Sequence, residues 1–363
     1  MKSIKFFCAV AALVISSFAS SNAQQTKVLT ADKHNEYGLV YSLPVTGLKI
    51  NVTVTKETRI AGPYFQYAKK FLGISDVIKE NSTFYTIREI SVRPVGLSDD
   101  KEQYLMQLKP GATTFIEVDQ NGMLLSINCK PTVPTQDSKP ATVFSSSSEK
   151  GSVDDYLKYV DMDFISSQSI VKQAEMIANS LMEVRDSYIS LTRGTADNVP
   201  TDGRQLELML NSLKQQEDAL TKAFTGTTFT SVETKEFLYV PQKDGREVLF
   251  RLSDFDGFVA ADDYSGVPVY ISTEVMLQGQ LPKDEAGVEK KLPKDAVIYA
   301  IPGVARINVS CNGTKFFEAE GEFAQFGTKF GLNPTLFSDK KERSFARFDP
   351  TTGALVELGV VTE

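Results

Sequence analysis

The sequence predicts an α+β protein in which two related β-rich modules flank a central antiparallel helical hairpin. Three observations support this fold class. Segments near both ends of the chain alternate apolar and polar residues, which is typical of half-buried strands. A central segment instead spaces its apolar residues three and four apart, which is typical of amphipathic helices. The final block of the chain also repeats motifs of the first block, which indicates an internal duplication.

The chain begins with a segment typical of a secretory signal peptide. Lys2 and Lys5 form a basic region, residues 6–14 are apolar, and a small-x-small cleavage site ends at Ala23. We predict cleavage after Ala23 and an extracytoplasmic protein, either periplasmic or associated with the outer surface. No later run approaches the roughly 20 apolar residues that a membrane-spanning helix needs, so no transmembrane segment is expected after cleavage.

The N-terminal module is predicted to span residues 24–130 and to contain a strand, a short helix and a hairpin. Alternating patterns predict strands at residues 48–58 and 83–96. Between them, residues 62–73 place aromatic side chains at helical spacing and end on a glycine, as a capped helix does. Residues 114–127 consist of two apolar runs around an Asn-Gly pair, which is a strong hairpin signal.

The middle of the chain is predicted to form the helical hairpin. Residues 131–153 are rich in Pro, Ser and Thr and are interpreted as a linker or long loop. Residues 154–226 carry two apolar stripes joined by a segment of turn residues, which predicts two antiparallel helices. Glu217 occupies an inward position of the second stripe, and Arg185 lies about as far before the turn. Two interpretations remain open: an Arg185–Glu217 ion pair across the hairpin, or a rotated helix with a solvated Glu217.

The C-terminal module is predicted to span residues 227–363 and to repeat the N-terminal one. The stretch that begins at Tyr41 matches the one that begins at Tyr299, and the hairpin pattern recurs at residues 344–358. Residues 62–73 match residues 321–332, which predicts a second short helix. Four identical pairs carry this last match: Gly62 and Gly321, Gln66 and Gln325, Lys70 and Lys329, and Phe71 and Phe330.

The repeated motif is interpreted as structural. A helix of about ten residues is unstable alone in water, so its aromatic face is expected to pack on the sheet of its own module. Gly62 and Gly321 would supply a positive φ or a helix cap; the alternative is the close approach of a ligand, although no phosphate-loop pattern accompanies them. Gln66 and Gln325 would either hydrogen-bond groups at a sheet edge or be exposed.

Two cysteines remain after signal cleavage, Cys129 and Cys311. An exported compartment permits a disulfide, but the sequence does not show whether the two residues are close. A 129–311 disulfide and two buried thiols therefore remain equal alternatives.

Patterns for catalysis and metal binding are sparse. The single histidine, His34, lies in a polar stretch and is interpreted as solvated, whereas triad and zinc sites need clustered partners. Four aspartates within residues 254–263 resemble calcium ligands but lack the spacing of an EF-hand, and they are interpreted as turn residues. We therefore predict no catalytic, metal or cofactor-binding residues and no cofactor. The chain has no tryptophan, which weakens the hypothesis of a glycan ligand but does not exclude it.

Several motifs have a combined resemblance to a known family. They are GPYFQYAKKFLGI at residues 62–74, the helical segments at residues 171–194 and 202–226, VLFRLSDFDGFV at residues 248–259, and AQFG at residues 324–327. Together they resemble an uncharacterised family of secreted proteins from Bacteroidetes-type Gram-negative bacteria, which is a domain of unknown function. The resemblance implies a periplasmic or surface protein, and it brings no activity and no catalytic residues.

These observations favour a non-catalytic envelope protein, a binding or scaffolding module for an envelope protein or a glycan. The formal charge is −7 before the basic signal peptide is removed, which argues against nucleic acid and anionic membranes as partners. One alternative is a hydrolase that uses carboxylates alone, which predicts a deep acidic cleft. Another is a periplasmic assembly factor or chaperone, which predicts an exposed sheet edge or apolar groove. The oligomeric state stays open.

Overall fold

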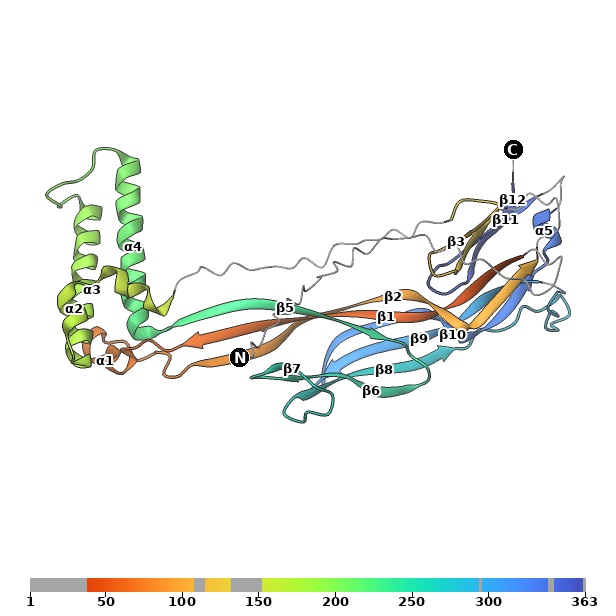
Figure 1. The fold of residues 1–363 in the computed structure, drawn as a ribbon, viewed down its shortest axis with the longest axis horizontal. Coiled ribbons are helices and arrows are strands. Elements are labelled where there is room, and N and C mark those ends of the chain that lie inside the picture. The colour runs from red at the N-terminus through yellow and green to blue at the C-terminus, as the bar shows by residue number, and fades with distance from the viewer. Residues whose placement is uncertain (1–37, 108–114, 132–151, 294–295, 339–342, 362–363) are drawn as a thin grey trace, which may run out of the picture. The chain divides into compact units, whose positions relative to one another are not determined.

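The computed structural model describes residues 38–361 except 108–114, 132–151, 294–295 and 339–342. It confirms the predicted fold class, because the described chain forms three sheets of antiparallel strands together with a helical hairpin (Figure 1). The predicted signal peptide, His34 and almost all of the predicted linker lie outside the described residues.

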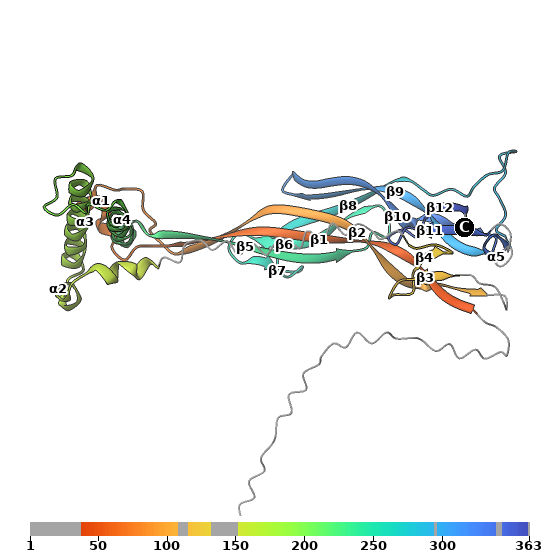
Figure 2. The same cartoon turned by 90° about the horizontal axis from the view of Figure 1, so that it is seen from above.

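The first sheet has three strands in the order β2-β1-β5. They are β1 (Gly38–Ile60), β2 (Ser82–Gln107) and β5 (Thr227–Tyr239). Strand β1 is central and pairs with β2 along almost its whole length and with β5 over its second half (Figure 2). At about 3.3 Å per residue, a strand of 23 residues is roughly 75 Å long.

The second sheet has five strands in the order β10-β9-β8-β6-β7. They are β6 (Gly245–Ser253), β7 (Gly257–Val259), β8 (Val267–Leu277), β9 (Val297–Cys311) and β10 (Thr314–Leu332). Alternate residues of β1, from Leu48 to Val54, pack against alternate residues of β8 and β9 such as Ile271 and Val309. These two sheets therefore form a β-sandwich, as the alternation of apolar and polar residues requires.

The third sheet has four strands in the order β12-β11-β4-β3. They are β3 (Ile116–Val118), β4 (Leu124–Ile127), β11 (Ser344–Phe348) and β12 (Leu355–Val360), and the short helix α5 (Thr335–Ser338) precedes β11. Its core includes Ile127, Ala346 and Phe348 together with Tyr41 from the start of β1. Because the predicted N-terminal and C-terminal modules each supply one hairpin, this sheet joins the two modules.

The predicted relation between the two modules extends to their hydrogen bonds. The Ser42 amide donates to the Gly122 carbonyl at 2.9 Å, and in the second module the Ala300 amide donates to the Gly353 carbonyl at 3.0 Å. In each module this bond connects the start of a long strand to the turn of the following hairpin. The matched tyrosines also agree, because Tyr41 pairs with Tyr104 of β2 as Tyr299 pairs with Phe330 of β10.

The predicted second short helix is wrong. Residues 62–73 form the 3-10 helix η1 (Phe65–Tyr67) and the helix α1 (Ala68–Leu72), which ends at Gly73 with a φ of 72°. Residues 321–332 instead belong to strand β10. Three glycines within this segment lower its helix propensity, and pairing with β9 satisfies its backbone. The structural counterpart of β10 in the first module is therefore β2, not α1.

The helical part of the chain follows the predicted hairpin closely. It comprises η2 (Val153–Tyr159), α2 (Met162–Ser166), α3 (Ile170–Arg193) and α4 (Gly203–Thr225). The side chains of Ser169 and Asp202 cap the first turns of α3 and α4, and α3 ends at Gly194 in the left-handed conformation. None of the helices in the described part of the chain is long and apolar enough to cross a membrane.

Strand β1 contributes to, or leads into, each of the three hydrophobic cores. Tyr41 and Leu43 belong to the core under the third sheet, and Leu48 to Val54 belong to the sandwich core. Directly after β1, Tyr64 enters the helical core, where its ring contacts those of Tyr156 and Phe224. The aromatic face of residues 62–73 thus packs against helices, which corrects the expectation that it packs on a sheet.

Candidate functional site

The structure brings Arg185 and Glu217 together. Arg185 Nε lies 2.7 Å from Glu217 Oε1, and both side chains are about one third exposed. The two residues come from α3 and α4, so of the two interpretations left open by the sequence the structure has the ion pair across the hairpin. An exposed pair of this kind contributes roughly 0.2–1 kcal/mol, so it helps to fix the register of the hairpin more than its stability.

Cys129 and Cys311 are free thiols in separate parts of the structure. Cys129 Sγ lies 3.3 Å from the Ala346 carbonyl oxygen in the third sheet, whereas Cys311 packs at the end of the sandwich core. Burial raises the pKa of both thiols, which lowers their reactivity as thiolates.

The two matched glycines have different roles, and neither has a positive φ. A Cβ on Gly62 would lie 2.5 Å from the Ala223 carbonyl oxygen, so only glycine lets this backbone approach the end of α4. The neighbouring Tyr64 amide donates to the same carbonyl at 3.0 Å. Gly321 has its nearest such contact at 3.7 Å, with the Phe323 ring. Gly62 is therefore a site of close backbone packing, and the expectation of a positive φ or helix cap is wrong for both.

The matched glutamines also differ. Gln66 is exposed, whereas the Gln325 amide group accepts from the Thr46 amide at 3.0 Å and donates to the carbonyls of Thr46 at 3.0 Å and Pro241 at 2.8 Å. Residues 324–327 interrupt the pairing of β10 with β9, and this bulge directs Gln325 to β1. Gln325 therefore links the two sheets of the sandwich.

The remaining matched residues take part in surface contacts. Lys70 lies over the Phe71 ring at 4.8 Å in α1. Lys329 forms an ion pair with Glu102 on strand β2 of the first sheet, and Phe330 packs edge-on against Tyr299. None of these contacts assembles a binding site, so the repeated motif has structural roles in the described chain.

The aspartates of residues 254–263 lie in two turns. The Asp256 carboxylate accepts from Ser253 Oγ at 3.2 Å, and the Asp263 carboxylate accepts from the Ser265 amide at 2.9 Å. Across residues 38–361, apart from the stretches left undescribed, three or more metal-ligating side chains do not gather anywhere. These aspartates stabilise turns, as interpreted from the sequence.

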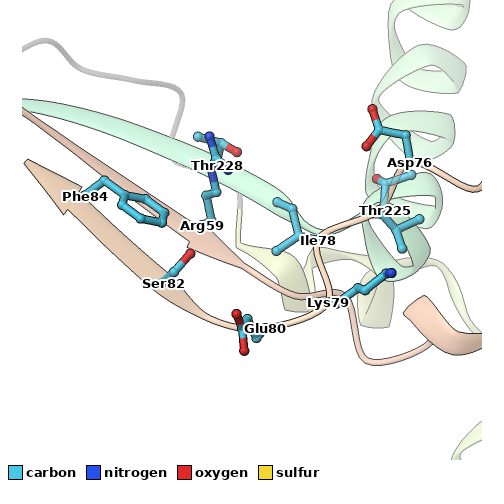
Figure 3. Close-up of a pocket in the computed structure, with 10 residues that line it drawn as sticks. Arg59, Asp76, Ile78, Lys79, Glu80, Ser82, Phe84, Thr225 and Thr228 are labelled. Carbon is cyan, nitrogen blue, oxygen red and sulfur yellow. The ribbon is translucent and has the colours of Figure 1, made fainter. Parts of the chain in front are cut away.

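A groove of about 560 Å³ lies where β1, β2 and β5 meet the helices (Figure 3). Side chains of both charge signs line it: Arg59, Lys79, Asp76 and Glu80. The Arg59 guanidinium is already engaged, because its Nε donates to Glu57 Oε1 at 2.6 Å and it lies over the Phe84 ring. Because both charge signs are present, the groove favours neither an anionic nor a cationic ligand. We interpret it as the junction between the strands and the helices.

Several carboxyl groups have a lowered pKa, because each accepts a hydrogen bond from a cation or a backbone amide. Lys329 lowers the pKa of Glu102, Lys158 that of Asp155, the Ser265 amide that of Asp263, and Lys315 that of Glu318. A glycosidase acid needs a raised pKa so that it remains protonated. Three of these groups are therefore suited to structural ion pairs and Asp263 to a turn, and none of the four is suited to general-acid catalysis.

The helical hairpin consists of two halves that are buried to different extents. In the half near the sheets, η1, α1 and η2 cover α3 and α4, and the side chains from Ala174 to Leu181 and from Ala219 to Phe224 form a core. In the distal half, Leu191 is the only buried side chain of the two helices. Two helices bury just one interface, so a third layer is needed to cover the rest.

The distal half accordingly exposes large apolar side chains. The exposed fraction is 42% for Met182, 41% for Ile189, 64% for Leu208 and 43% for Met209. A shallow groove of about 340 Å³ lies between the helices there. Its lining residues, which we call the hairpin groove, are Tyr188, Gly203, Leu206, Glu207, Leu210, Asn211 and Lys214.

Sequence reasoning did not identify this groove. The apolar stripe of α4 includes Leu206 and Leu210 and was interpreted as the helix–helix contact, which is correct for the half near the sheets. The signal that could have found the groove is the length of the stripes, because they continue beyond the segments that could cover them.

The comparisons with known proteins show a family but no activity. A family model described as a domain of unknown function, DUF4831, matches residues 37–356. No curated protein and no solved structure matches the chain. The matched residues cover most of the sequence, so the chain belongs to the DUF4831 family.

Proposed function

We propose that this protein is an exported, non-catalytic binding module whose helical hairpin docks an amphipathic helix of another envelope protein. The hydrophobic n-terminal segment that ends at Ala23 supports export. The observation that carries the binding function is the hairpin groove, where the hairpin lacks the third layer that covers its other half.

The shape and charge of the groove favour a helix as the occupant. It runs between two antiparallel helices, which is the geometry of helix-in-groove recognition. Glu207 and Lys214 are seven residues apart and thus two turns apart on one face of α4, on either side of Leu210. A helix that lies antiparallel to α4, with a basic and an acidic residue two turns apart, pairs with both charges while an apolar residue between them contacts Leu210.

Site-specific photo-crosslinking in cells tests the proposal. A photoreactive residue replaces Leu210, and a matched control replaces Glu183, which is exposed and lies roughly 140° around α3 from the groove residue Tyr188. The expected result is a crosslink from position 210, and not from position 183, to an amphipathic helix of one partner. Lys214→Glu should abolish this crosslink, and reversal of the facing charge in the partner should restore it.

Other outcomes would overturn the proposal. Equal capture from positions 210 and 183 would show non-specific contact. A crosslink from position 210 to a second copy of the chain would show that the groove takes part in self-association and does not bind a partner helix. A crosslink to an envelope glycan would favour polymer binding instead.

A further inference from the structure

The three sheets have six edges, and five of them carry features that prevent pairing with other strands. Exposed edge strands offer free backbone groups, and proteins protect them with charges, proline or short length. Strands β3 and β7 have three residues each. Charged residues occur repeatedly along β2, β5 and β10, and β2 also contains Pro94.

Strand β12 lacks these features. Its sequence is LVELGV. Its one charged residue, Glu357, forms an ion pair with Arg347 of the adjacent strand β11. Three alternate side chains are apolar and exposed: Val356 by 59%, Leu358 by 47% and Val360 by 53%. Among the residues that the structure describes, no strand pairs with the outer side of β12.

The exposed apolar row continues a buried one. Across the sheet, Ile127 pairs with Ala346 and Ala346 pairs with Leu358. Ile127 and Ala346 are fully buried, whereas Leu358 is nearly half exposed. The core under the third sheet therefore ends at β12 with an uncovered apolar margin, to which one further strand could be added.

We propose that β12 pairs with β12 of a second copy of this chain, antiparallel and across a two-fold axis at Leu358. This register places the two Leu358 side chains opposite each other and each Val356 opposite the partner strand's equivalent of Val360. The two apolar rows then form one continuous row, and both free edges disappear.

The charges of β12 are compatible with this register and with a second copy as the occupant. Each Glu357 faces the glycine at position 359 of the other copy, so the two carboxylates are not opposed. A register centred on Glu357 would place two like charges directly opposite each other, which is destabilising. Position 359 requires glycine, because a Cβ there would lie 2.6 Å from a carbon of the Phe345 ring. The Leu358-centred register therefore aligns the apolar row of β12 with itself and opposes no like charges.

The first test is the oligomeric state of the full secreted chain by analytical ultracentrifugation. We expect a dimer for the natural sequence and a monomer for Leu358→Lys, with an unchanged circular dichroism spectrum because this side chain is already half exposed. The matched control is Leu238→Lys, an exposed leucine on the protected edge strand β5, which should remain dimeric. A natural sequence that is monomeric at all accessible concentrations would overturn the proposal.

Cysteine crosslinking tests the register, in a chain whose two native cysteines are replaced by serine. Opposed residues of an antiparallel pair have Cβ atoms about 4.5–5.5 Å apart. Leu358→Cys should therefore form a covalent dimer on mild oxidation. Val356→Cys alone should not, whereas a mixture of Val356→Cys and Val360→Cys chains should.

The result does not depend on the hairpin groove, because the two surfaces contain no common residue. Absence of a Leu358→Cys dimer in a chain that sediments as a dimer would place the interface elsewhere and overturn the proposal. Capture of extended segments from other proteins at β12, with no self-association, would also overturn it and would favour the assembly-factor alternative.

Discussion

The Tyr41 hydroxyl provides a direct test of how the two related modules are held together. It accepts a hydrogen bond from the Ile298 amide at 2.7 Å and donates one to the Ile298 carbonyl at 3.0 Å. Tyr41 is 1% exposed and Ile298 is 8% exposed, so water cannot easily replace the phenol. One side chain at the start of β1 thus satisfies both backbone groups of a residue at the start of β9.

Tyr41→Phe removes a single oxygen and leaves these two backbone groups without their partner. A buried polar group that loses its hydrogen bond costs about 1–3 kcal/mol. Because carbonyls tolerate this loss better than amides, we expect a total loss of about 2–4 kcal/mol in the free energy of unfolding. Tyr299 is the repeat counterpart, and no hydrogen bond of its hydroxyl is found in the described part of the chain. Tyr299→Phe should therefore cost less than about 0.5 kcal/mol, as expected for a substitution away from such a network.

Urea unfolding followed by circular dichroism compares the two variants, and amide hydrogen exchange reports on Ile298 directly. In Tyr41→Phe the Ile298 amide should exchange much faster, while the amides of the helical core should be affected less. The reasoning is refuted if both variants unfold at the same urea concentration, or if the protection of Ile298 is unchanged.

Three further predictions follow from contacts described above. Gly62→Ala should lower the melting temperature strongly, because the added Cβ meets a carbonyl of α4, whereas Gly321→Ala should have little effect; equal effects would contradict the packing argument. Glu102→Gln should destabilise the protein by less than about 1 kcal/mol at pH 7. Because the pKa of Glu102 is lowered in the fold, this difference should start to shrink as the pH falls below the unfolded pKa and should vanish below the lower folded pKa; a constant difference would argue against the ion pair. A double-mutant cycle of Arg185→Ala and Glu217→Ala should give a coupling of about 0.5 kcal/mol at low salt, and a coupling of zero would indicate a solvated glutamate.

Local patterns in the sequence were sufficient to predict many of the elements. Alternation at residues 48–58 and an Asn-Gly turn define structure within a few residues, so β1 and the β3–β4 hairpin could be predicted. The seven-residue spacing in the middle of the chain predicted α3 and α4, but it left open whether Glu217 pairs with Arg185 or is solvated, and only the structure shows the contact.

Features that depend on distant partners could not be predicted in this way. Residues 321–332 have the same spacing of Gly, Gln, Lys and Phe as residues 62–73, yet β9 pairs with them and makes them a strand. The pairing of β5 with β1 likewise joins segments from the two predicted modules. The exposed margin of β12 and the hairpin groove exist because no other segment of the described chain packs over them. A local sequence pattern does not show which segments pack together in the fold.

The central position of β1 has a consequence for the rate of folding. Its last residue, Ile60, pairs with Thr227, so the first sheet cannot be completed until a long stretch of chain has been made and brought back. Chains dominated by such distant contacts fold slowly. The α3–α4 hairpin forms from contacts close in sequence and ends directly before β5. We therefore expect early formation of the hairpin to shorten the search by which β5 finds β1, so that the helices speed the completion of the sheet beside them.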